Sequence, residues 1–122
     1  MAAVDKSIED LSLFEIDLVI ALVLNRFIVT VHTVDDKSCC KIAVNEEYNS
    51  FPFRPTTEPR DAIPLAEEFK VGVAWDATKQ VWVSHCHNVK DFFAQHKEMM
   101  PAQMLAILKA YKGSIVRVPL LS

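Results

Sequence analysis

The run Ser84-His85-Cys86-His87 concentrates side chains that could bind a metal or act as nucleophiles. On a strand, His85 and His87 would share one face at a spacing of about 7 Å, which suits a single Zn²⁺ ion. A third ligand such as His96 would have to fold back onto them. The sequence holds no Cys-x-x-Cys pair and no His-x-x-x-His pair. We therefore predict no metal and no cofactor. A ligand or interface role for the two histidines, or no special role, stays open.

The cysteines are poorly placed for catalysis. Adjacent residues on a strand point to opposite faces, so His85 and His87 would be aimed away from Cys86, whereas a catalytic dyad needs hydrogen-bond reach. A disulfide between the neighbours Cys39 and Cys40 would be strained. The three cysteines are thus expected to be structural thiols in a reducing compartment. The acidic pairs are typical of turns and surfaces, and we predict a protein that is not an enzyme.

A proline-bearing stretch, 46–59, carries a cluster of aromatic residues with one arginine. It is longer than most connections, which raises the chance that it binds something. The aromatic residues form either an interface anchor or pocket wall, or a cap that folds back onto the core. The residues predicted to bind a ligand or partner, from this stretch and from the histidine run, are Tyr48, Phe51, Phe53, Arg54, Trp82, His85 and His87.

Composition narrows the classes of protein. A chain of 122 residues, 51% of them hydrophobic, is one folded domain. Two glycines leave little material for a phosphate-binding loop, and a net charge of −3 makes nucleic-acid binding improbable. The longest apolar run, 18–24, is far shorter than the ~20 residues that span a bilayer. We expect a cytoplasmic protein with no membrane association.

The segment 12–25 should form a helix. Ser12 and Glu15 have the spacing of a capping box. Apolar residues cover nearly the whole circumference of this helix, so it must be buried on more than one side. Its second side is covered either by a partner subunit, which predicts a homo-oligomer formed through helix 12–25, or by the chain's own sheet.

The remaining patterns predict an α+β fold. Residues 1–10 are expected as a flexible leader and 11–122 as a single α+β domain. In it, a small antiparallel sheet of about four strands is covered by an N-terminal and a C-terminal helix. The strands are expected at 27–34, 39–45, 69–75 and 80–87. A helix of one to two turns, limited by Pro64, is expected at 61–68, a polar connection at 88–98, a final helix at 101–112, and a short strand or arm at 114–118.

Four short motifs resemble the NinX-like family of small bacteriophage and prophage proteins, whose function is unknown. They are Phe14-Glu15-Ile16-Asp17, Asp61-Ala62-Ile63-Pro64-Leu65, Val81-Trp82-Val83 and Met100-Pro101-Ala102-Gln103-Met104. The family's usual tryptophan and arginine are replaced here by Ile63 and Gln103. The resemblance implies a phage origin and expression in the host bacterial cytoplasm. It transfers no catalytic residue.

Two functions are consistent with these features. The first is a non-enzymatic early accessory protein of a bacteriophage, which binds and modulates a host protein such as a defence or regulatory factor. The second is an oligomeric binder that sequesters a nucleotide signal at a subunit interface. Stacking and phosphate contacts would then come from Arg54, Arg60, Tyr48, Trp82, His85 and His87. The absence of a catalytic constellation favours the first.

Overall fold

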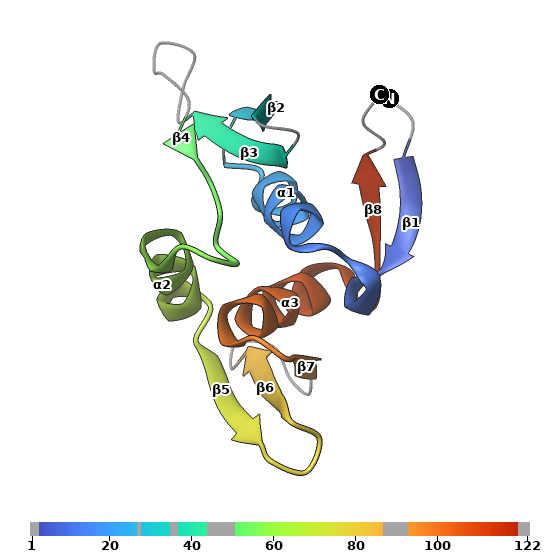
Figure 1. Cartoon of the computed structure of the whole chain (residues 1–122), viewed down its shortest axis with the longest axis vertical. Coiled ribbons are helices and arrows are strands. Elements are labelled where there is room, and N and C mark those ends of the chain that lie inside the picture. Colours follow the sequence, from blue (N-terminus) through green and yellow to red (C-terminus); the bar gives the residue numbers. More distant parts are fainter. Residues whose placement is uncertain (1–2, 27, 35–36, 44–50, 87–92, 120–122) are drawn as a thin grey trace.

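The computed structural model describes residues 3–26, 28–34, 37–43, 51–86 and 93–119 (Figure 1). Its helices are a short 3-10 helix at Ile8–Asp10, α1 at Leu13–Leu24, α2 at Pro59–Glu68 and α3 at Met99–Lys112. Its strands are β1 (Ala3–Ser7), β2 (Ile28–Val34), β3 (Lys37–Ala43), β4 (Phe51–Pro52), β5 (Val71–Asp76), β6 (Val81–Cys86), β7 (Phe93–His96) and β8 (Ile115–Pro119).

The predicted first helix and its capping box are confirmed. The Ser12 hydroxyl accepts the amide hydrogen of Glu15 at 3.2 Å, and the Glu15 carboxylate accepts that of Ser12 at 2.9 Å. These bonds satisfy amides that a helix N-terminus otherwise leaves unpaired. Asn25 has the left-handed backbone (φ 53°) that commonly ends a helix.

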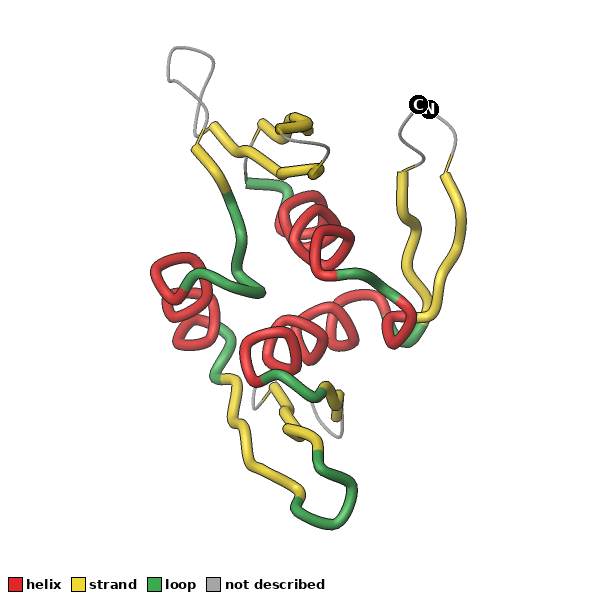
Figure 2. The backbone as a smooth tube through the Cα atoms, in the orientation of Figure 1, coloured by secondary structure: helices red, strands yellow, loops and turns green. Residues whose placement is uncertain are grey.

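Helices α1 and α3 pack together at the centre of the molecule (Figure 2). Fully buried side chains from both helices, such as Ile16, Ile20, Leu105 and Leu108, form the core. Sheet β2-β3-β4 covers α1, whereas sheet β5-β6-β7 covers α3 on the other side. Burying the central helix pair therefore takes a sheet on each side.

The fold class α+β is confirmed, but a single sheet of about four strands is wrong. The described strands form three antiparallel sheets of 2, 3 and 3 strands. The predicted strands pair as two hairpins, β2-β3 and β5-β6, and each hairpin gains a short third strand from the segment that follows it. One of these, β7, falls in the segment 88–98 that was expected to be a polar connection.

The segment expected as a flexible leader is folded in its described residues. Strand β1 pairs with β8 in antiparallel register, from Ala3 opposite Pro119 to Ser7 opposite Ile115. Ile8, which follows, is buried in the core, and its amide donates to the Ser114 carbonyl at 2.9 Å. The predicted strand at 114–118 is thus present and pairs within the chain rather than as an arm on a neighbour.

The apolar circumference of α1 is largely explained inside the chain. One side packs on α3 and another on β3, and most of its apolar side chains are buried. Leu22 is its large exposed hydrophobic residue, at 42% exposure. The homo-oligomer expected through this helix stays a prediction, but the pattern that motivated it no longer requires a second subunit.

Helix α2 is longer than Pro64 led us to expect. It spans 10 residues, begins with Pro59 in its first turn and includes Pro64 in its interior. Helix α3 starts at Met99, two residues before the expected Pro101, and ends at Lys112 as expected; its C-cap is Gly113, whose φ is 78°. None of the described helices is long and apolar enough to cross a lipid bilayer.

Candidate functional site

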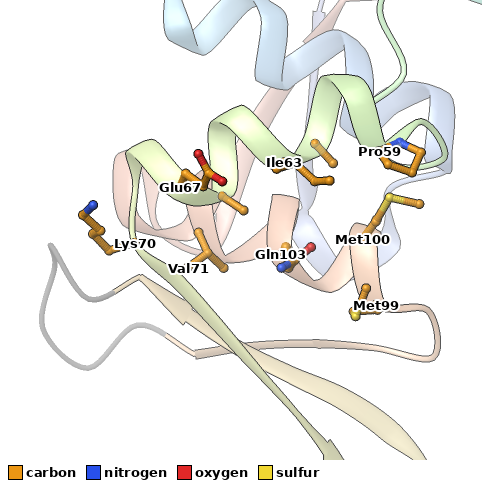
Figure 3. Close-up of a pocket in the computed structure, with 10 residues that line it drawn as sticks. Pro59, Ile63, Glu67, Lys70, Val71, Met99, Met100 and Gln103 are labelled. Carbon is orange, nitrogen blue, oxygen red and sulfur yellow. The ribbon is translucent and has the colours of Figure 1, made fainter.

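An apolar groove lies between α2 and the first turns of α3 (Figure 3). Its volume is about 680 Å³, within the range of pockets that bind ligands or partner side chains. The residues that line it come from α2, α3 and the chain entering β5: Pro59, Ala62, Ile63, Ala66, Glu67, Lys70, Val71, Met99, Met100 and Gln103.

The periodicity of α2 produces one wall of this groove. The lining residues of α2 follow the spacing i, i+3, i+4 and i+7, which places them along one face of the helix: Pro59, Ala62, Ile63 and Ala66. Lys70 has a left-handed backbone (φ 53°), which turns the chain from α2 into β5. This turn brings Val71 to the groove.

The rim of the groove exposes large apolar side chains. Ile63 is 54% exposed and Met99 is 41% exposed. Methionine side chains are flexible and polarizable, and they adapt to differently shaped apolar partners. Large apolar side chains grouped at the rim of a concave surface are typical of interaction sites.

The polar residues of the groove are few. Glu67 and Lys70 lie at one end, whereas Pro59, Met99 and Met100 lie at the other (Figure 3). The ionisable side chains among the described lining residues are those of Glu67 and Lys70, and these residues include no cysteine, serine or histidine. Most of the lining is apolar, so the groove suits the binding of apolar groups.

A second polar cluster surrounds Asp17, which the sequence analysis did not single out. Asp17 is 5% exposed, and its carboxylate accepts hydrogen bonds from the Thr56 amide (3.0 Å) and the Thr56 hydroxyl (3.1 Å). Burial raises its pKa from an ordinary 3.8 to about 7; the bonds from Thr56 oppose this rise, Asp61 adds to it, and Arg54 opposes it. The sequence signal was an acidic residue directly before a run of apolar residues, 18–24.

The structure separates the aromatic residues of the loop from one another. Phe53 is 4% exposed and belongs to the core, which supports the core-cap interpretation for this residue. Phe51 is 57% exposed on β4. The Arg54 side chain is exposed, and its backbone amide donates to the Asp61 carboxylate at 3.0 Å. Tyr48 lies outside the described residues.

Trp82 and His85 point to opposite faces of the same sheet. Trp82 lies opposite Trp75 on β5 and opposite His96 on β7. The ring centroids of Trp75 and Trp82 are 5.3 Å apart. His85 pairs with Phe93 at a ring distance of 5.4 Å. His96 therefore shares the face of Trp82 and points away from the side of His85.

The predicted site residues that the structure describes do not lie together in one chain. Strand β4, which carries Phe51, and strand β6, which carries Trp82 and His85, lie on opposite sides of the α1–α3 layer (Figure 1). His87 lies outside the described residues. Within the described part of the chain, no group of three or more His, Cys, Asp or Glu side chains could hold a metal ion.

The described cysteine side chains are buried as thiols. Cys40 is 1% exposed and Cys86 is 2% exposed. Burial raises the pKa of the Cys86 thiol, so the reactive thiolate is disfavoured. The side chain of Cys39 lies outside the described part of the structure.

Comparison with known proteins finds no matching family model and no matching curated sequence. The resemblance to NinX-like proteins therefore stays a prediction, based on the four motifs alone.

Proposed function

We propose that this chain is a non-enzymatic bacteriophage accessory protein that binds and modulates a host protein in the bacterial cytoplasm. The groove between α2 and α3 holds an amphipathic helix of that host protein. The observation that supports this function is the apolar lining of the groove, with Ile63 and Met99 exposed at its rim. The phage origin rests on the sequence resemblance.

The dimensions of the groove favour a helix as its occupant. Helix α2 has 10 residues and is about 15 Å long. Its groove-lining face, from Pro59 to Ala66, continues to Lys70 just beyond its end. A partner helix of similar length presents apolar side chains at positions i, i+3 or i+4, and i+7 along such a wall. Glu67 and Lys70 at one end supply the polar rim that usually surrounds an apolar contact.

The charges of the groove disfavour a nucleotide there. Among the residues that the structure describes, Lys70 is the one cationic side chain that lines it, and Glu67 lines the same end. A phosphate held by Lys70 would lie close to this carboxylate, which would weaken the attraction. Nucleotide sites usually offer several cations or backbone amides that converge on the phosphates. A protein segment fits the observed lining better.

A photo-cross-linking experiment tests the proposal. A benzophenone amino acid is placed at Ile63, in the groove, or at Ile115, on β8, in the protein expressed in bacterial cells. The two isoleucines are matched in exposure, at 54% and 55%. We expect a discrete adduct with one host protein from position 63 and none from position 115.

The partner identified in this way is then purified for calorimetry with Ile63→Glu and Ile115→Glu. We expect Ile63→Glu to weaken binding at least tenfold, because a carboxylate would be buried against apolar side chains, and Ile115→Glu to leave it unchanged. Equal affinities of the two variants, or no specific adduct from position 63, would refute the proposed function.

A further inference from the structure

Asp17 links two parts of the fold that are distant in sequence. Among the described residues, it is the one acidic or basic residue that is buried. Both oxygens of its carboxylate bind Thr56, which lies 39 residues further along the chain, in the segment between β4 and α2. The contact ties this segment to α1.

The same segment is also tied to α2. The Arg54 amide donates to the Asp61 carboxylate, and the Arg54 carbonyl accepts from Thr57 at 3.0 Å and from Glu58 at 2.7 Å. Residues 54–58 therefore form a compact turn between Asp17 on one side and the first turn of α2 on the other. The charged groups that act on Asp17 are Arg54 from this turn and Asp61 from α2.

We propose that Asp17 is a proton-operated latch: when its carboxyl is protonated it holds residues 54–58, which lead into α2, against α1, and when it ionises it releases them. Both Thr56 contacts are available to the acid form. One oxygen still accepts from the Thr56 amide, and the protonated oxygen donates to the Thr56 hydroxyl, which rotates to accept. No charge is then buried.

Ionisation places a negative charge in the same buried position. Its interaction with Thr56 and Arg54 only partly offsets the loss of water, and Asp61 adds repulsion. Water reaches the carboxylate if the 54–58 turn moves away from α1. The pKa of about 7 for Asp17 places this change within the range of ordinary cellular and experimental pH.

The latch acts on one wall of the groove. Because the 54–58 turn leads directly into α2, its release loosens the helix that carries Ile63. The effect on partner binding rests on the proposed function, whereas the latch itself does not depend on it.

Amide hydrogen exchange of the full chain without any partner tests the latch. The relevant amides are those of Thr56, which binds Asp17, and Ala62, which donates to the Glu58 carbonyl. After correction for intrinsic exchange, their opening constants should rise about tenfold per pH unit between pH 5 and pH 7 and level off above it. Amides in the middle of α3 should show a smaller change, because the opening is local.

Asp17→Asn is the deciding variant, since its amide makes the same two contacts with Thr56 and carries no titrating proton. We expect no pH-dependent rise in its opening constants, and the wild-type rise to persist in Asp10→Asn, which alters an exposed residue. The proposal is overturned by an equal rise in Asp17→Asn, or by an equal change in α3. A carbon-13 titration of the wild-type Asp17 carboxyl with a midpoint below pH 5 would also overturn it.

Discussion

Replacing Asp17 by asparagine should stabilise the protein at pH 8 and have little effect at pH 4. The pKa of Asp17 rises from an ordinary 3.8 to about 7 in the folded state, because the carboxyl is buried. The folded state therefore binds this proton more tightly than the unfolded state. The stability that Asp17 contributes is complete below about pH 4 and is lost as the pH rises through about 7.

The size of the effect follows from the difference between the two pKa values. The pKa is shifted by about 3 units, and each unit corresponds to about 1.4 kcal/mol. Above pH 7 the ionised carboxyl therefore lowers the free energy of unfolding by up to about 4 kcal/mol. At pH 5.5 about half of this cost remains. Asparagine has nearly the same shape and keeps both contacts with Thr56, so at pH 4 the two proteins should agree within about 1 kcal/mol.

Urea unfolding between pH 4 and pH 8, followed by the fluorescence of Trp75 and Trp82, measures the free energy of unfolding of both proteins. Glu15 and Glu68 oppose the trend of Asp17, because their pKa values are lowered and they lose stabilising contacts as the pH falls. Their contribution is the same in both proteins and cancels in the difference. A difference that does not change from pH 4 to pH 8 would refute the reasoning.

Three further changes test the local structure. Ser12→Ala removes the cap from the Glu15 amide and should cost about 1 kcal/mol in urea unfolding; no change would mean that the capping box does not hold in solution. Ser84→Ala removes a fully buried hydroxyl that donates to the Ala102 carbonyl of α3. It should cost about 1 kcal/mol in the same assay, and an unchanged midpoint would contradict this contact. Cys86 should react with a thiol reagent much more slowly in the folded protein than in urea, because its thiol is buried and its pKa is raised; equal rates would contradict its burial.

The features that the sequence predicted correctly are those encoded by neighbouring residues. The capping box of Ser12 and Glu15, the neighbouring strands expected at 69–75 and 80–87, and the end of the final helix at 112 each involve residues that are close together in the sequence. The arrangement of the sheets depends on contacts across the whole chain. Strands β1 and β8 pair about 110 residues apart, and no local pattern distinguishes such a strand from a leader.

The candidate site residues also depend on contacts that local sequence patterns do not reveal. Phe51 and Phe53 are close in sequence, but one is exposed on β4 and the other is buried in the core. Trp82 and His85 similarly point to opposite faces of one sheet. The groove combines α2 with α3, and the exposure of Ile63 and Met99 is determined only when these helices pack. The sequence analysis grouped residues that are close together in the chain. In the structure, these residues lie on different surfaces or in the core.

Asp17 escaped the sequence analysis for a related reason, since its partner Thr56 is 39 residues away. Its position is informative because an asparagine there would make the same contacts without the cost of a buried charge. Residues that cost stability in a well-packed core are found most often where a protein binds, reacts or switches. Asp17 contacts the turn that leads into the helix forming the groove wall, so this cost arises where ionisation of one side chain can alter the site.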